Sequence, residues 1–196
     1  MNLLLALTGA SGTTYARRLL DALGRHCPTG VVSIIVTPEA RQIAADELGL
    51  QLAEDGRGIE SGLSISADSL RFFPPGDFSA PFASGSSPPD AMVICPCTVG
   101  TLGRIAGGTA DNLVVRAADV CLKERRKLIL VVRETPLSAI HIGNMATVTQ
   151  AGGIVLPACP SFYSRPQTVD QVADTVVARI LDHLGIRNDL VRRWGQ

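Results

Sequence analysis

The stretch LLLALTGASG, residues 3–12, decides the fold of this 196-residue chain. Five apolar residues in a row end at a turn with two glycines, and residues 13–23 then carry apolar side chains at helical spacing. A buried strand that leads through a glycine turn directly into a helix is typical of a βαβ unit with a parallel sheet. The turn and the helix start also offer backbone N–H groups to an anion or cofactor, the alternative being a plain turn of small residues.

The same order of strand and helix recurs along the rest of the chain. Further strands are predicted at residues 31–36, 91–95 (stopped by Pro96), 128–132 and 154–156, and further helices at 39–48, 99–105, 111–123, 137–150 and 169–184. Residues 51–69 fit a short helix or strand, and 72–89 are too rich in Pro, Gly and Ser for a regular element. We therefore expect one α/β domain over residues 1–196, a Rossmann-like (flavodoxin-type), doubly wound and mostly parallel sheet in three αβα layers.

Composition excludes several classes of protein. Lys and Arg total 18 and Asp and Glu total 18, and a net charge of zero excludes nucleic-acid binding through bulk positive charge. A hydrophobic content of 46% excludes a disordered chain and favours an oligomer that buries surface, with an ordinary aliphatic core as the alternative. The number of cysteines, five, is odd, and four of them lie in or beside apolar runs, which indicates a reducing cytoplasm. No apolar run reaches the ~18 residues that span a membrane. Cys and His lack metal-site spacing, so no metal is expected.

Polar side chains follow the predicted strands, where ligands bind in doubly wound sheets. Thr37 offers a hydroxyl to a phosphate or ribityl group, or caps the following helix. The run Thr98-Val99-Gly100-Thr101 forms a second possible anion cradle. Arg133 and Glu134 follow a buried strand directly, where charges are either used or paired in a salt-bridged helix start.

Further candidates lie in loops and on helices. The loop at residues 83–87, ASGSS, offers three hydroxyls to an anion but also has the composition of a flexible linker. Tyr163 follows the last strand and either donates to a phosphate or packs. Arg116, Lys123 and Arg179 lie on helices, where basic side chains more often mark a solvated face.

Seven motifs occur in one order along the chain: TGASG (8–12), ASGSS (83–87), CPCTVGT (95–101), RAADVCLKERR (116–126), VVRETP (131–136), FYSRPQ (162–167) and RRWG (192–195). In this the chain resembles the flavin prenyltransferase (UbiX/Pad1) family over almost its whole length. The resemblance implies a dodecamer that binds FMN and joins the dimethylallyl group of dimethylallyl phosphate to N5 and C6 of reduced FMN, without a metal. The product, prenylated FMN, then serves a UbiD-type decarboxylase. The family was itself long labelled a decarboxylase.

The resemblance also assigns roles to residues of this sequence. It implies FMN contacts at Gly9, Ala10, Ser11, Thr37, Thr98, Val99, Gly100, Thr101 and Arg133. It implies prenyl phosphate contacts at Ser86, Arg116, Lys123, Tyr163 and Arg179, with Arg133 close by. Lys123, Arg133 and Arg179 would neutralise the charge of the leaving phosphate. Glu134, the released phosphate or Glu47 would accept the C6 proton. Phe78 stands where some relatives carry Trp beside the prenyl group. In the family the pocket is built where subunits meet, so one subunit need not supply every group.

Three other functions fit parts of the sequence. TGASG occurs in short-chain NAD(P) oxidoreductases, but neither tyrosine has the lysine four residues later that such enzymes use. An FMN-dependent decarboxylase of the cysteine-decarboxylase type would use an early His and an Asn-Met-rich loop, which His26 and Asn144-Met145 match weakly. A non-catalytic flavin carrier would not need the run of phosphate-binding cations.

Overall fold

A single sheet of six parallel strands organises the chain, in the order β3-β2-β1-β4-β5-β6. The structure is a computed structural model and describes residues 1–27, 30–193 and 195. The strands are β1 (Asn2–Leu7), β2 (Val31–Val36), β3 (Leu70–Phe72), β4 (Ala91–Cys97), β5 (Lys127–Val132) and β6 (Ile154–Val155). The predicted doubly wound fold is confirmed. Its strand order is that of the Rossmann fold rather than the 2-1-3-4-5 order of flavodoxin, because the extra strand β3 extends the sheet beyond β2.

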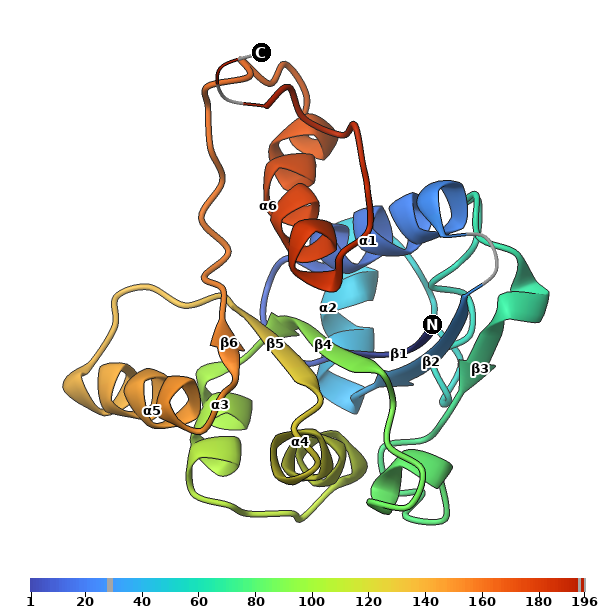
Figure 1. Ribbon diagram of the computed structural model, residues 1–196. Coiled ribbons are helices and arrows are strands. Elements are labelled where there is room, and N and C mark those ends of the chain that lie inside the picture. The colour runs from blue at the N-terminus through green and yellow to red at the C-terminus, as the bar shows by residue number, and fades with distance from the viewer. Residues whose placement is uncertain (28–29, 194, 196) are drawn as a thin grey trace.

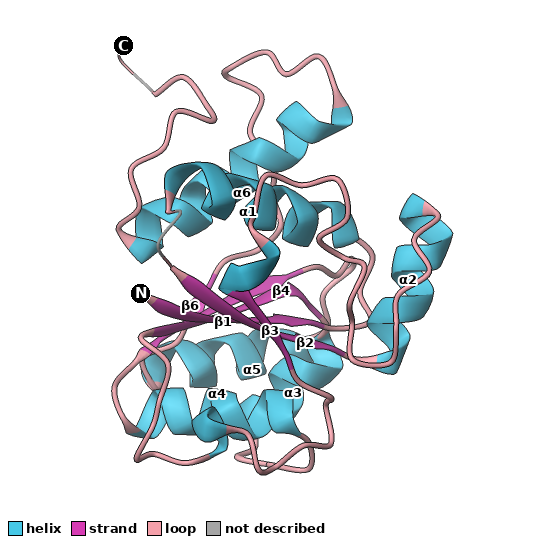
Figure 2. Cartoon of the chain, turned by 90° about the vertical axis from the view of Figure 1, so that its right-hand side faces the viewer, coloured by secondary structure: helices cyan, strands magenta, loops and turns pink. Residues whose placement is uncertain are grey.

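Helices cover both faces of the sheet (Figures 1 and 2). On one face α1 (Thr13–His26) packs beside α6 (Val169–Leu184). The other face carries α3 (Val99–Ala106), α4 (Leu113–Lys123) and α5 (Ala139–Gln150). The remaining helix, α2 (Pro38–Leu48), stands at the end of the sheet where the strands finish, to the right in Figure 2. The three layers place the strand ends, and whatever binds there, next to α2 and the start of α1.

The central position of β1 in the sheet explains why its sequence is an uninterrupted apolar run. Leu3, Leu5 and Leu7 belong to the core cluster under α1 and α6, whereas Leu4 and Ala6 belong to the cluster over α3 and α4. All five side chains are at most 1% exposed. A strand with helices on both faces buries every side chain. It therefore lacks the alternation of polar and apolar residues that is seen in a strand with one face in water.

The strand predicted to stop at Pro96 instead continues to Cys97. The β4–β5 pairing shifts its register between Ile94 and Cys97, and such irregularities tolerate a proline, which has no N–H to donate. The carbonyl of Pro96 accepts hydrogen bonds from the N–H and the hydroxyl of Thr8, at 3.2 and 2.9 Å. These bonds tie the end of β1 to the end of β4.

The segment 51–69, predicted to hold a short helix or strand, contains a short 3₁₀-helix at Ala67–Ser69, and β3 follows it directly. Of the segment 72–89, predicted to be irregular, Phe72 belongs to β3, and the rest is irregular apart from a short 3₁₀-helix at Pro81–Ala83.

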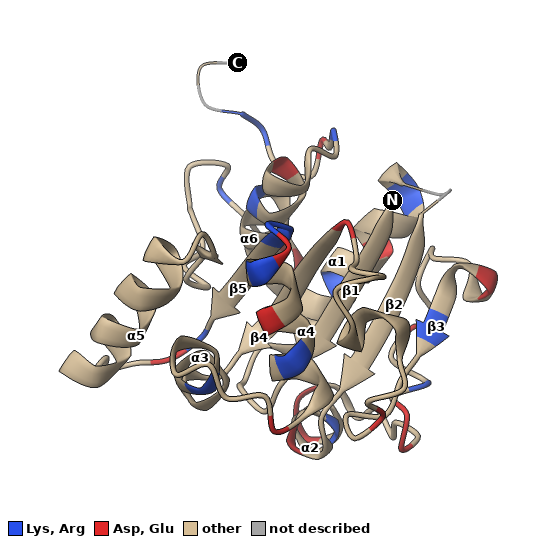
Figure 3. Cartoon of the chain, turned by 60° about the horizontal axis from the view of Figure 1, so that its bottom comes forward, with Lys and Arg blue, Asp and Glu red and all other residues tan. Residues whose placement is uncertain are grey.

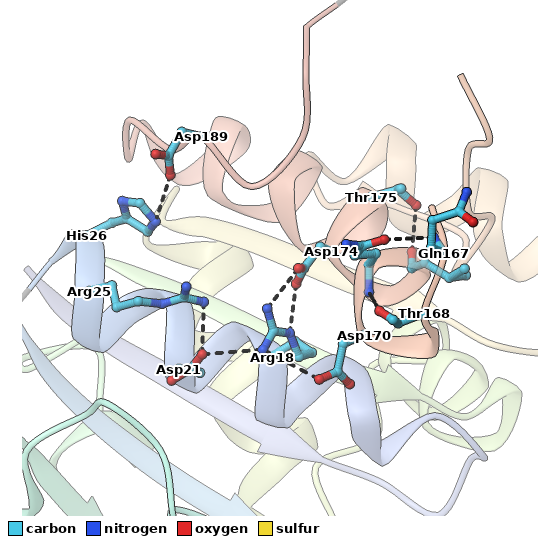
Figure 4. A network of polar contacts seen from close by, with 12 residues as sticks. Arg18, Asp21, Arg25, His26, Gln167, Thr168, Asp170, Asp174, Thr175 and Asp189 are labelled. Carbon is cyan, nitrogen blue, oxygen red and sulfur yellow. Dashed lines mark hydrogen bonds and ion pairs between the residues drawn. The ribbon is translucent and has the colours of Figure 1, made fainter. Parts of the chain in front are cut away.

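An ion-pair network fixes α6 against α1 (Figure 4). Arg18 donates from Nε and Nη2 to the two carboxylate oxygens of Asp174, both at 2.8 Å. Asp174 is only 6% exposed, and its hydrogen bond is the largest cause of the raised pKa of Arg18. Asp21 joins the network and also accepts from Arg25. The position of α6, and of the side chains that it carries, is therefore set by charge pairing as well as by apolar packing.

All five cysteines are free, and the three in β4 and α4 are buried. Burial raises the pKa of the Cys97 and Cys121 thiols to about 12 and that of Cys95 even further. Such thiols are inert core residues. Among the described residues, no helix is long and apolar enough to cross a membrane.

Candidate functional site

The sheet has its switch point between β1 and β4, whose following helices lie on opposite faces. Ligands of doubly wound folds bind at this place, beyond the carboxyl ends of the strands. A hollow of about 510 Å³ opens here, which we call the strand-end hollow. It is lined by Thr8, Gly9, Thr37, Pro38, Glu39, Pro75, Gly76, Thr98, Thr101, Arg104, Asp111 and Asn112.

Hydroxyl groups and helix starts dominate the strand-end hollow. Thr37 caps α2 by accepting from the N–H of Ala40 at 3.3 Å, so its capping role is present. Thr98 caps α3 by accepting from the N–H of Thr101 at 3.0 Å, and it also contacts the Thr101 hydroxyl. Two helix starts with their partial positive charge thus face one space. This donor set fits a phosphate on a hydroxylated chain, such as the ribityl phosphate of FMN.

The glycine turn before α1 already binds an anion from within the chain. The carboxylate of Glu47, at the end of α2, accepts from the N–H groups of Gly12 and Thr13, both at 2.8 Å. Gly12 has a φ of 115°, a left-handed conformation that favours glycine and aims these N–H groups at the carboxylate. Ala10 closes the turn by donating to the carbonyl of Thr8. The predicted anion cradle exists, but at Gly12 and Thr13 its occupant is Glu47.

The electrostatics keep Glu47 ionised. Burial raises the pKa of Glu47, but hydrogen bonds from Ser11, Gly12 and Thr13 lower it by more, so the net shift is downward. At neutral pH the side chain is therefore a carboxylate held at the positive end of α1.

Replacing Glu47 by glutamine should destabilise the protein by about 1 kcal/mol at pH 7, after allowance for solvent screening. A carboxyl whose pKa falls on folding stabilises above its unfolded value, about 4.3, and loses that effect as the pH drops through the folded value. The difference between wild type and Glu47→Gln should therefore shrink between pH 7 and pH 3.5, as measured by urea unfolding. Asp46→Asn, on the same helix, is the control. A difference that does not change with pH would contradict the role given to the charge.

A second hollow, of about 390 Å³, adjoins Glu47, and we call it the Glu47 hollow. Arg133 reaches it from the end of β5. Tyr15 also lines it, and burial raises the pKa of Tyr15 while the nearby Arg133 opposes this rise. The sequence indicated Tyr15 only as one apolar position of a helical stripe. The remaining lining residues are Ser11, Gly12, Thr14, Leu48, Val169 and Asp170.

Glu134 lies beside Arg133 and is exposed, with one carboxylate oxygen accepting from the N–H of Thr135 at 3.0 Å. The N–H of Arg133 itself donates to the carbonyl of Cys97, which joins the ends of β5 and β4. The structure thus places the predicted FMN residues and both predicted acids at the carboxyl edge of the sheet.

The loop at residues 83–87, which we call the serine loop, lies at the opposite, amino edge of the sheet. Asp90, which follows this loop, exchanges hydrogen bonds with Asn2 at the start of β1. Lys127, which begins β5 just after α4, is in register with Ala91 at the start of β4. The amino edge of the sheet therefore carries both the loop at residues 83–87 and the end of α4.

Lys123 lies beside Gly85, the neighbour of Ser86, at this amino edge. Gly85 approaches Lys123 and Glu124 so closely that a Cβ at position 85 would clash with both side chains. Lys123 forms an ion pair with Glu124, and the hydroxyl of Ser86 lies 3.0 Å from that of Ser84. The contact with α4 shows that the loop is a packed element rather than a flexible linker.

Arg116 fastens the same loop to α4. Its Nε donates to the carbonyl of Ala83 at 2.9 Å, and its Nη1 pairs with Asp119 at 3.0 Å. Phe78 precedes the loop and is 49% exposed. The structure therefore brings Arg116 and Lys123 to the serine loop and leaves Phe78 accessible.

The last two candidates lie over α6. Tyr163 is 79% exposed, and the side chain of Arg179 is 63% exposed. Both line a pocket of about 950 Å³, which we call the tail pocket because the C-terminal segment forms one wall. Its lining is Ser161, Tyr163, Ser164, Thr175, Ala178, Arg179, Asp182, Asn188, Val191, Arg192, Arg193 and Gly195.

One chain does not gather all the candidates around one ligand. Lys123 precedes β5 and Arg133 follows it, so the six residues of this strand separate them by roughly 20 Å. A phosphate touched by both would have to lie between two copies of the chain. The sequence already indicated this separation, because Lys123 ends a predicted helix before the strand and Arg133 follows that strand.

Comparison with known proteins gives matches over the full length. The flavoprotein family profile matches residues 1–181. The flavin prenyltransferase UbiX of Pseudomonas aeruginosa is 46% identical over 196 residues, covering 98% of this chain and 93% of that protein. A dodecameric FMN-dependent UbiX-like decarboxylase from Escherichia coli O157:H7 superposes with a TM-score of 0.89 at 38% identity, with full coverage of both chains. AnUbiX, solved with FMN and dimethylallyl pyrophosphate, gives a TM-score of 0.86 at 34% identity and covers 100% of this chain and 97% of its own.

Proposed function

This chain belongs to the UbiX family of flavin prenyltransferases, and on that basis we propose that it transfers a dimethylallyl group to reduced FMN. The observation that carries the proposal is the strand-end hollow, which is lined by two helix starts and four threonines. Bound there, reduced FMN supplies the electron-rich N5 and C6 positions that accept the five-carbon group. We propose that the transferred group comes from dimethylallyl phosphate and that residues 1–196 act as one flavoprotein domain.

The residues at the carboxyl edge suit the flavin. The phosphate and ribityl chain are held by Thr37, by the first turn of α3 from Thr98 to Thr101, and by the turn of Gly9, Ala10 and Ser11. Arg133 borders the Glu47 hollow next to that turn. We assign it contacts with both the flavin and the incoming phosphate. Glu134, one residue further on, accepts the proton that leaves C6.

The basic residues suit the leaving phosphate. Lys123 and Arg179 are the right types to neutralise a monophosphate as its C–O bond breaks, and the hydroxyls of Ser86 and Tyr163 add donors. Arg116 positions the serine loop through its bond to Ala83. The exposed ring of Phe78 offers a π face to the positive charge that develops on the allylic fragment. Fixed cations of this kind neutralise the phosphate without a metal ion.

We propose that the site is completed by neighbouring subunits of a closed assembly. A dodecamer is proposed because the similar UbiX-like protein of Escherichia coli O157:H7 is dodecameric. The separation of Lys123 from Arg133 supports such an assembly, and the composition and exposure of α5 support it as well. No charged residue occurs from 137 to 150 (Figure 3). Ile140 is 74% exposed and Ile142 is 56% exposed. An apolar helix of this kind needs a covering surface, and a second copy of the chain supplies one.

We also propose that the protein works in the cytoplasm, where its five free cysteines stay reduced, and that a UbiD-type decarboxylase receives its product.

The proposed function is tested by mixing the purified protein with reduced FMN and dimethylallyl phosphate and recording the mass of the flavin. A gain of one five-carbon prenyl unit is expected. Dimethylallyl pyrophosphate serves as the competing donor, and a reaction with it alone would reassign the donor. Release of CO₂ from a cysteine-containing substrate, or NAD(P)H turnover without prenylation, would overturn the proposal.

A further inference from the structure

Asp182 gathers donors from α6 and from the C-terminal segment. Arg179 donates from Nη1 to Asp182 at 3.0 Å. Arg193 donates from Nη1 and Nη2 to both carboxylate oxygens, at 3.1 and 2.7 Å, and Asn188 adds a contact from Nδ2 at 3.3 Å. A single carboxylate therefore holds two arginines that both line the tail pocket.

The chain reverses direction to make this contact. Gly185 ends α6 in the left-handed conformation, with a φ of 79°, and the chain then folds back along the helix. Ile186 and Leu190 pack against the core cluster under α1 and α6. Arg193 thereby returns to Asp182 from eleven residues further along the chain. The segment 186–193 is held by apolar side chains on one side and by Asp182 on the other.

The charges in the tail pocket favour an anion. Its lining includes Arg179, Arg192 and Arg193 but one aspartate, Asp182. The side chains of Arg179 and Arg193 are 63% and 48% exposed, and exposed ion pairs add little to stability. The arrangement is better explained by orientation. Arg193 gives two nitrogens to the carboxylate, which fixes the plane of its guanidinium, and Arg179 gives one, which restricts where its guanidinium lies. The N–H groups that Asp182 does not use can then bind a phosphate.

We propose that Asp182 is a positioning residue of the donor's phosphate subsite, which orients Arg179 and holds Arg193 in place as a further phosphate ligand. The proposal rests on the proposed function in so far as Arg179 binds the donor's phosphate. Asp182 acts through the two arginines and does not itself touch the substrate.

The protonation state of Asp182 agrees with this role. The hydrogen bond from Arg193 is the largest cause that lowers the pKa of Asp182, and burial opposes it. The carboxylate is therefore ionised at neutral pH, and its hold on the arginines is lost only as the pH falls through the lowered folded value.

The kinetic test compares Asp182→Asn with Asp189→Asn, which removes the same charge from the same segment at a 92% exposed side chain. Asp182→Asn should raise the KM for dimethylallyl phosphate about tenfold, with a smaller loss in kcat because Lys123 still neutralises the leaving phosphate, and with FMN affinity unchanged. Arg193→Gln should raise this KM to a similar degree, and Asp182→Glu should restore part of the loss. Asp189→Asn should leave all three values unchanged. An unchanged KM in Asp182→Asn, or an equal loss of FMN affinity, would overturn the proposal.

A second readout does not depend on prenyl transfer. Trypsin should cleave the segment 186–193 faster in Asp182→Asn than in wild type or Asp189→Asn, and inorganic phosphate should slow cleavage in wild type but not in Asp182→Asn. Equal cleavage rates in Asp182→Asn and wild type would overturn the positioning role, even for a protein that did not accept dimethylallyl phosphate. Absence of prenylation together with the expected cleavage pattern would sink the proposed function and leave a phosphate subsite ordered by Asp182.

Discussion

Replacement of Lys123 by alanine is expected to lower kcat for prenyl transfer by about 10²–10³-fold, while the Kd for FMN stays unchanged. A monophosphate is a poor leaving group unless its charge is neutralised as the bond breaks, and Lys123 stands where the serine loop packs against the end of α4. The loss should fall on kcat rather than on KM alone, because the phosphate gains charge in the transition state. Single-turnover formation of prenylated FMN, followed by mass, measures this directly.

Arg126→Ala is the matched control, since it removes a positive charge three residues away in the same basic run. It should keep turnover within about twofold, as expected for a cation on a solvated face. If the two variants lost activity equally, the effect would belong to the net charge of this surface and not to Lys123.

Glu134→Gln should bind FMN normally and form product about 10²–10⁴-fold more slowly, because the amide cannot accept the proton that leaves C6. Glutamine retains an oxygen for the N–H of Thr135, so the local structure should persist. In the kinetics, the bond to N5 should still form early, and the loss of the C6 proton that completes the product should then be slow.

Glu47→Gln provides the comparison for Glu134→Gln. Glu47 is held by the start of α1 with a lowered pKa, which makes it a weaker base. Its replacement should affect stability more than the proton-transfer step. Full turnover in Glu134→Gln combined with a large loss in Glu47→Gln would transfer the role of proton acceptor to Glu47.

Local features of the sequence were sufficient to predict the layers and the strand ends. The apolar run of β1 and the glycine turn after it lie within one short segment, and the threonines that cap α2 and α3 follow their strands directly. Their position at the switch point follows once the strands are parallel, because parallel strands end at one edge.

Contacts between distant segments could not be predicted in this way. Glu47 meets Gly12 across 35 residues, and no local pattern distinguishes it from an exposed acid at a helix end. The same holds for Asp182, whose partner Arg193 lies beyond the turn after α6. Pro96 misled the prediction for β4 because a register shift, invisible in the sequence, accommodates it.

In the proposed assembly, the two edges of the sheet meet in one site between subunits. Mixing two inactive variants tests this claim most directly. Lys123→Ala and Arg133→Ala subunits are dissociated in mild denaturant, combined in equal amounts and reassembled. If each site takes Lys123 from one subunit and Arg133 from another, about a quarter of the sites regain both residues, so prenyl transfer returns to about a quarter of the wild-type rate. Failure of the reassembled mixture to exceed the activity of either variant alone would contradict a site shared between subunits.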